Sequence, residues 1–214
     1  NSFLQNINNK NNNRNFIIKN PAGEHAICAG LKEEMSVLIK GHVGYYCGGM
    51  NQKANITVDG NAGTGLGENM MSGTIHVKGN TSQSTGATAH GGTIIIDGDA
   101  SSRCGISMKG VEIIVKGSVG HMSAFMAQAG TLLICGDAGE ALGDSIYETV
   151  IYIAGTPKSL GADCIEKKIT NKDLKKIENL ISKANIKKLK PHNFKKFGSA
   201  RKLYNFNIDN VSDY

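Results

Sequence analysis

The sequence predicts an all-β fold, a single-stranded parallel β-helix of about seven coils, followed by a C-terminal helix and a basic tail. Three observations predict it: glycine recurs seven times at a fixed interval of 19 residues, a short apolar pattern precedes each of these glycines, and charges alternate in sign beside them. The glycines are Gly41, Gly60, Gly79, Gly98, Gly117, Gly136 and Gly155. A repeat of this length indicates stacked copies of one small unit, which bury their apolar faces against each other.

The residues before each glycine have the pattern of a β-strand. Apolar residues stand two and four positions before it, as Ile94 and Ile96 do before Gly98. Alternation with period two and an excess of β-branched side chains are typical of strands. Glycine also recurs at two later positions of the repeat, which predicts tight corners with positive φ. Each repeat is therefore expected to form about three short strands and three corners, with coils about 4.8 Å apart. The handedness of the coil stays open.

The position just before five of the glycines carries charges of alternating sign. These residues are Lys40, Asp59, Lys78, Asp97 and Lys116. In a parallel, in-register stack, neighbouring coils would place opposite charges side by side, and a slip by one coil would bring like charges together. A catalytic pair of Asp59 and Asp97 is the disfavoured alternative, because Lys78 would lie between them.

The 214 residues divide into three parts by composition. Residues 1–15 hold eight asparagines and are expected to be disordered, residues 16–164 form the β-helix, and residues 165–214 form a helical and basic-aromatic tail. No run of about 18 apolar residues predicts a membrane span, and no signal-peptide pattern is present. We therefore expect a cytoplasmic protein without membrane association.

The tail carries the whole basic excess of the chain. Residues 1–164 have 11 basic and 13 acidic side chains, whereas residues 165–214 have 13 basic and 5 acidic ones. Thr170 and Asp173 resemble a helix N-cap, and the apolar spacing that follows predicts a helix over 171–184. Large apolar residues later in the tail must either cover an open end of the β-helix or insert into a partner. The candidate docking residues are Phe194, Phe197, Arg201, Lys202, Tyr204 and Phe206. An acidic protein surface is a better partner than nucleic acid, because no nucleic-acid motif is present.

The sequence assigns no catalytic, cofactor-binding or metal-binding residue. The five cysteines lack paired spacing, and three of them (Cys28, Cys47 and Cys104) share one repeat position with leucines, which predicts buried, reduced thiols. The six histidines form no HxH or HExxH pattern and are interpreted as structural or surface residues. The segment from Gly63 to Gly67 has GxGxG spacing rather than the GxGxxG of dinucleotide-binding loops, so we interpret it as a tight corner.

Several segments carry a resemblance to a known family. They include GHVGYYCGGMN at 41–51, GENMMSG at 67–73, GATAHGG at 86–92 and KFGSARKLYNF at 196–206. With the GxGxG motif and the coil length, they resemble the C-terminal β-helix domain of the glutamate synthase large subunit. They are most similar to stand-alone versions of that domain, exemplified by the separate β-helix subunit of N-methylglutamate synthase (methylamine–glutamate N-methyltransferase). The resemblance spans about residues 16–208.

The resemblance implies a non-catalytic scaffold subunit. It implies two partner chains, a class II glutamine amidotransferase-like subunit and a glutamate synthase-like subunit that carries FMN and an iron–sulfur cluster. The motif glycines are then structural: Gly41, Gly60, Gly63, Gly65, Gly67, Gly79, Gly98, Gly117, Gly136 and Gly155. A self-sufficient β-helix enzyme or a carbohydrate-binding protein is the alternative. It is disfavoured because aromatic residues are only 6% of the chain and Tyr45–Tyr46 is their only adjacent pair.

Overall fold

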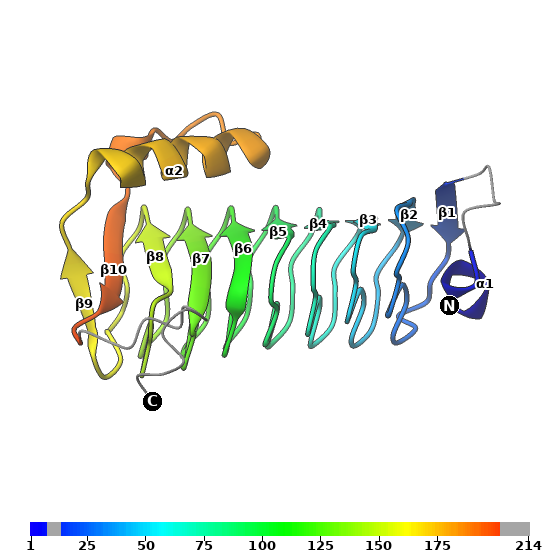
Figure 1. Cartoon of the computed structure of the whole chain (residues 1–214), viewed down its shortest axis with the longest axis horizontal. Helices are drawn as coiled ribbons and strands as arrows, with labels where there is room; N and C mark the ends of the chain where they lie inside the picture. Colours follow the sequence, from blue (N-terminus) through cyan, green and yellow to red (C-terminus); the bar gives the residue numbers. More distant parts are fainter. Residues whose placement is uncertain (8–13, 202–214) are drawn as a thin grey trace, which may run out of the picture.

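The computed structural model describes residues 1–7 and 14–201, which form a parallel β-helix with one long strand in each coil (Figure 1). The ten strands make one sheet in the order β1-β2-β3-β4-β5-β6-β7-β8-β10-β9. The coil strands are β1 (Asn15–Lys19), β2 (Ser36–Lys40), β3 (Asn55–Asp59), β4 (Thr74–Val77), β5 (Thr93–Ile96), β6 (Lys109–Val115), β7 (Ala129–Ile134) and β8 (Val150–Ile153). The other elements are α1 (Ser2–Gln5), β9 (Cys164–Lys167), α2 (Asn171–Lys183), the 3-10 turn η1 (Pro191–Asn193) and β10 (Lys195–Ser199).

The coils stack in the predicted register. Ile56 of β3 pairs with Ile75 of β4, which pairs with Ile94 of β5, so each step equals the 19-residue period. Two of the four neighbouring pairs in the charged column form ion pairs: Lys78 Nζ lies 3.4 Å from Asp59 Oδ1, and Lys116 Nζ lies 2.7 Å from Asp97 Oδ1. The in-register parallel β-helix is therefore confirmed.

The expectation of three strands per coil is wrong. In the described coils, the second side is a column of single parallel bridges through Val43, Ala62, Thr81, Ala100, Val119, Ala138 and Pro157. Bends or turns lie within two residues of each bridge position, and the pairing extends no further. The description as a single-stranded helix holds.

On the third side of the coil, every second residue has a positive φ. In one coil Ser84, Gly86 and Thr88 have φ values of 59°, 67° and 54°. The Ser84 and Thr88 amides donate to carbonyls of the following coil, and the Gly86 amide donates to the preceding coil. A Cβ on Gly86 would lie 2.6 Å from the Ile113 side chain in the core. The prediction of corners with positive φ is confirmed for this side, and Gly65 and Gly67 of the GxGxG segment are such positions.

In the column of glycines that defines the 19-residue period, glycine is needed mainly for lack of space rather than for positive φ. Gly98 is outside the left-handed region, yet an added Cβ would overlap Asn80 Oδ1 and lie 2.9 Å from the Gly79 carbonyl oxygen. Asn80 Oδ1 accepts a hydrogen bond of 2.8 Å from the Asp99 amide of the next coil. The same bond recurs in the column His42, Asn61, Asn80, Asp99, Ser118 and Asp137, in which each side chain accepts from the amide 19 residues later. From Gly79 to Gly155, the glycines of the column make room for this ladder of side-chain acceptors.

Both ends of the stack are covered by the chain itself. At the N-terminal end, residues 2–5 form α1, and Leu4 and Ile7 are buried against the core. The expectation that residues 1–15 are disordered is therefore wrong for Ser2–Ile7, because these two apolar side chains cover the first coil. At the C-terminal end, β10 enters antiparallel between β8 and β9, so the tail joins the sheet across the expected boundary at residue 164. Pairing with β8 satisfies the strand edge of the last coil.

Candidate interaction surface

Helix α2 lies across the outer faces of the later coil strands (Figure 1). One residue of each strand points outward at the centre of the strand. In β2 to β4 these residues are of mixed character: Leu38, Thr57 and His76. In the strands beneath the helix they are large and mostly apolar: Ile95, Ile114, Leu133 and Tyr152. The latter four form one buried cluster with Ile177, Leu180, Ala184 and Phe194. Burying an Ile or Leu side chain stabilises by about 1.5–3 kcal/mol, so this cluster is a second core outside the coils.

A buried carboxylate joins α2 to the last strands. Asp173 Oδ1 accepts a hydrogen bond of 2.6 Å from the Tyr152 hydroxyl and lies 2.8 Å from Lys196 Nζ. Its Oδ2 accepts from the amide and hydroxyl of Thr170, at 2.8 and 2.6 Å, and thereby completes the predicted cap. Burial alone would raise the pKa of Asp173, but these donors outweigh it and hold that pKa well below its ordinary value. Burial of the Tyr152 side chain raises the pKa of Tyr152, and the adjacent Asp173 carboxylate raises it further.

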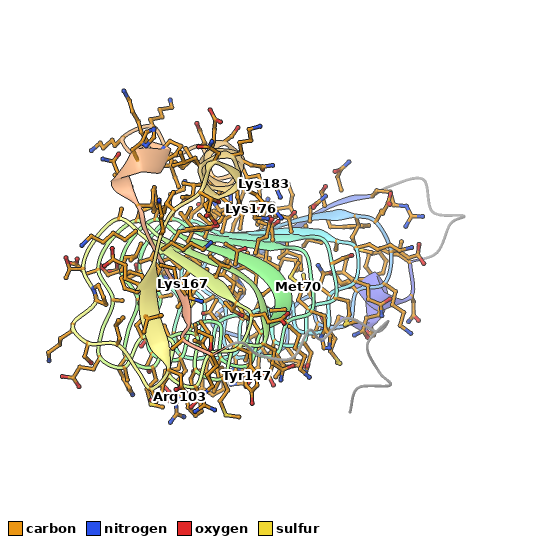
Figure 2. All side chains as sticks on the ribbon, turned by 60° about the vertical axis from the view of Figure 1, so that its left-hand side comes forward. Met70, Arg103, Tyr147, Lys167, Lys176 and Lys183 are labelled. Carbon is orange, nitrogen blue, oxygen red and sulfur yellow. The ribbon has the colours of Figure 1, made fainter. Side chains whose placement is uncertain are left out.

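A second carboxylate holds the other end of the helix. Glu112 on β6 lies 2.5 Å from Lys176 Nζ and 2.6 Å from Lys183 Nζ, and Figure 2 shows both lysines on α2. Burial would raise the pKa of Glu112, but the two ammonium groups lower it overall. Apolar packing and two carboxylates therefore fix the position of α2.

Of the predicted docking residues that the structure describes, two are buried and one lies at the surface. Phe194 and Phe197 are each only 3% exposed: Phe194 packs under α2 and Phe197 packs into the coil core. Their assignment to partner docking is therefore wrong in this structure, and the alternative of covering their own β-helix holds. Arg201 remains at the surface, 2.6 Å from Asp163. The other three candidates, Lys202, Tyr204 and Phe206, lie outside the described residues.

Folding of the tail leaves its lysines outside. We call the following residues the lysine surface: Lys168, Lys172, Lys175, Lys187 and Lys188, all exposed on α2 and on the segments that flank it. Within the described part of the chain, the ion pairs of the tail use other basic residues, namely Lys176, Lys183, Lys196 and Arg201. An array of unpaired like charges repels itself and favours an acidic partner.

A groove opens beside this surface, where the chain returns from α2. We call it the loop groove, and its volume is about 460 Å³. It is lined by Lys116, Cys135, Asn185, Ile186, Lys187, Lys188 and Leu189. The size falls within the range of small ligand sites, roughly 300–1,000 Å³.

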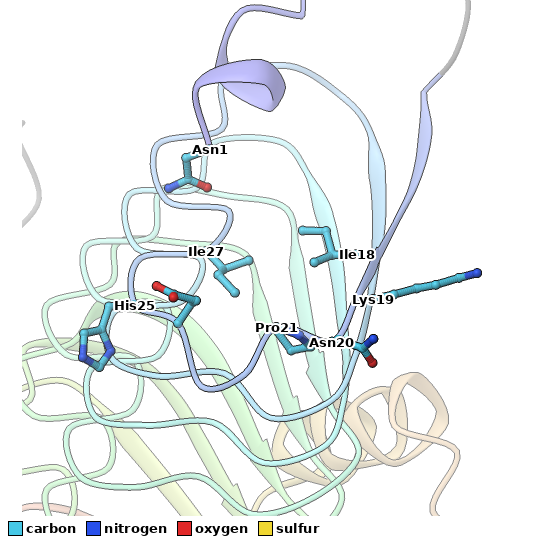
Figure 3. Close-up of a pocket in the computed structure, with 8 residues that line it drawn as sticks. Asn1, Ile18, Lys19, Asn20, Pro21, His25 and Ile27 are labelled. Carbon is cyan, nitrogen blue, oxygen red and sulfur yellow. The ribbon is translucent and has the colours of Figure 1, made fainter.

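A further hollow lies at the N-terminal end of the stack. Its volume is about 380 Å³, and Figure 3 shows Ile18 and Ile27 facing each other across it, below Asn1. His25 at its rim stacks on Tyr45 with ring centroids 4.6 Å apart, and its Nδ1 accepts a hydrogen bond from the Tyr45 amide. This histidine therefore links two coils, as expected of a structural residue.

The thiols have the buried positions that the sequence predicts. Cys28, Cys47 and Cys104 are fully buried in the coil core, and burial raises the pKa of Cys28 and Cys104 to about 12. Cys135 is half-buried in the loop groove, where burial raises its pKa to about 11. Among residues 1–7 and 14–201, no cluster of three or more His, Cys, Asp or Glu side chains could hold a metal ion. Nor does any helix in those ranges have the length and apolar character needed to cross a membrane.

The alternating corner with its GxGxG segment faces away from α2. Figure 2 shows Arg103, a left-handed residue of this side, across the coils from the helix. Amides of this corner donate to neighbouring coils, as the Gly65 amide does to the Gln83 carbonyl and the Gly67 amide to the Cys47 carbonyl. The Gly65 and Gly67 amides of the motif are thus already used in hydrogen bonds between coils.

Comparison with known proteins agrees with this geometry. The family model described as "GXGXG motif" matches residues 3–208. This chain belongs to the GXGXG motif family. It is also 52% identical to Protein GlxC of Rhizobium meliloti (strain 1021), over 100% of this chain and 94% of that protein. The resemblance to GXGXG domains is therefore confirmed over nearly the whole chain.

The acceptor ladder is the feature of this GXGXG protein that the sequence interpretation missed. A signal for it exists, because the residue after each glycine of the 19-residue column is short and polar or a histidine. Along the stack, these residues form one line of acceptors, each facing a backbone donor of the next coil.

Proposed function

We propose that this protein is the scaffold subunit of a glutamate synthase-like complex. The observation that carries the proposal is a continuously hydrogen-bonded rod with a lysine surface beside it that makes no ion pair within residues 1–7 and 14–201. In a rod of this kind the coils are tied together along the strand ladder and, from His42 to Thr156, along the acceptor ladder as well. Such a body suits the holding of other subunits at fixed separations.

The specific reaction that we propose for the complex is that of N-methylglutamate synthase, in which methylamine and glutamate give N-methylglutamate and ammonia. One proposed partner is a class II glutamine amidotransferase-like subunit, and the other is a subunit that carries FMN and an iron–sulfur cluster. This chain is proposed to contribute position rather than reacting groups. Its thiols support this role, because Cys28, Cys47 and Cys104 are fully buried in the coil core.

We further propose a cytoplasmic complex that does not bind nucleic acid. The five cysteines are all unpaired, which is typical of proteins in a reducing compartment. Lys187 and Lys188 of the lysine surface line an apolar groove rather than a stacking platform of exposed aromatic side chains.

Co-expression with the two proposed partners tests the function. A stable ternary complex with a flavin and iron–sulfur absorption spectrum and methylamine-dependent formation of N-methylglutamate is the expected result. Omission of this chain should then leave the two partners separate and the activity greatly reduced. A fully active pair of partners without this chain would contradict the scaffold role, and ammonia-dependent glutamate formation would redirect the assignment to an ammonia-using relative.

A further inference from the structure

The loop groove combines an apolar interior with a cationic rim. Ile186 and Leu189 pack against the cluster under α2 and line one wall, and Cys135 lies in the groove as well. Lys187 and Lys188 stand exposed at its edge. A site of this composition fits an apolar side chain that is accompanied by carboxylates.

The floor of the groove lies where the alternating charges of the coils stop. Lys116 still pairs with Asp97, but the next two residues of the same column are Cys135 and Ala154. The loop over 185–190 packs against these uncharged positions of the column and covers part of them. The rest of the column remains open as the groove, so its apolar surface is only partly covered by the chain itself.

We propose that the loop groove receives an apolar side chain from an acidic segment of a partner subunit. This inference rests on the proposed function, since it names the surface through which the scaffold is docked. The volume of about 460 Å³ has room for a large aliphatic or aromatic side chain. Lys187 and Lys188 make no ion pair within the described residues, so carboxylates on the incoming segment would find free partners. An apolar anchor in a pocket with a charged rim is the usual arrangement of an interface hot spot.

Peptide binding to the isolated full chain tests the groove without any partner. Two fluorescein-labelled probes of equal charge would be titrated, one of alternating glutamate and leucine and one of alternating glutamate and serine. The leucine peptide should bind about tenfold more tightly or better, because its side chain is buried in the groove. The preference should disappear in the double variant Lys187→Glu with Lys188→Glu. It should persist in Lys172→Glu with Lys175→Glu, which makes the same charge change on α2 away from the groove.

Equal binding of the two peptides would overturn the proposal, because it would show attraction by charge alone. An equal loss of preference in both double variants would overturn it too. Sedimentation of the chain alone is a further check: dimers that disappear in the Lys187→Glu, Lys188→Glu variant would identify a second copy as the occupant, against the proposal.

Cys135 provides a readout in the assembled complex. It is the half-buried thiol, whereas Cys28, Cys47, Cys104 and Cys164 are buried. Maleimide labelling of Cys135 at mildly alkaline pH should slow about tenfold or more when the partners bind. An unchanged labelling rate in a complex that does form would overturn the groove assignment while leaving the scaffold function intact. A chain that forms no complex would instead contradict the proposed function, and the peptide result would still decide the chemistry of the groove.

Discussion

Substitution of Asp173 by alanine should release helix α2 from the β-helix. The carboxylate caps the helix through Thr170 and receives hydrogen bonds or charge from Tyr152 and Lys196. Its side chain is 8% exposed and that of Lys196 is 19% exposed. The variant would therefore leave a largely buried ammonium group and a hydroxyl without their shared partner.

The expected loss is comparable with the whole gain from docking the helix. Removing one partner of a buried ion pair costs about 3–5 kcal/mol, and losing a helix N-cap costs roughly 1 kcal/mol. Against this, the fully buried Ile177 and Leu180 each contribute about 1.5–3 kcal/mol. Since the two totals are similar, α2 should open frequently while the coils stay folded. A loss of about 3 kcal/mol corresponds to more than a hundredfold fall in protection of the α2 amides.

Native-state hydrogen exchange of the α2 amides is the assay, with the coil strands as an internal reference. Glu178→Ala is the matched control, because Glu178 is an exposed acidic residue of the same helix. Protection of α2 in Asp173→Ala within about threefold of the wild type would refute the reasoning. So would an equal loss in Glu178→Ala, because helix charge rather than the buried network would then hold α2.

Three further outcomes are expected. Gly98→Ala should destabilise the coils by about 1–3 kcal/mol in urea denaturation, because its Cβ would displace Asn80. Asn80→Ala should cost roughly 0.5–1.5 kcal/mol through the lost acceptor of the Asp99 amide, and the two changes together should cost less than their sum; strict additivity would argue against the ladder. The α2 contacts should be fully present above about pH 5 and weaken as the pH falls below it. The reason is that the pKa values of Asp173 and Glu112 are lower in the folded state than in the unfolded chain; α2 exchange that does not change down to about pH 2 would contradict this.

How far the sequence predicts this fold depends on how local each feature is. The period, the strand of each coil and the in-register stack follow from columns such as Ile56, Ile75 and Ile94, because a repeat places like residues side by side. The cap at Thr170 is equally local, since both partners lie within one helical turn. Buried thiols such as Cys104 follow from the leucines that share their column.

Other features required the folded chain. The residue after each repeat glycine carries a visible pattern, but its role appears only when Asn80 is seen to accept from the Asp99 amide of the next coil. Positive φ explains a corner glycine such as Gly86, whereas at Gly98 the close approach of the neighbouring coil decides. A position with positive φ and a position without space for a Cβ both require glycine. The sequence alone therefore does not tell which of the two causes applies.

The sequence by itself determined a stack of coils and a basic, apolar tail that needed a surface to bury its phenylalanines. The tertiary structure alone decided which surface that is. Phe194 packs on the protein's own β-helix because Ile114 and its neighbours present an apolar stripe there, and Phe197 packs into the coil core because β10 pairs with β8. The lysines between the apolar residues are then turned outward, which converts the expected docking tail into a folded platform with a charged face. Where the tail packs depends on which apolar faces of the molecule meet. The 19-residue pattern does not specify this, because the tail lies outside the repeat.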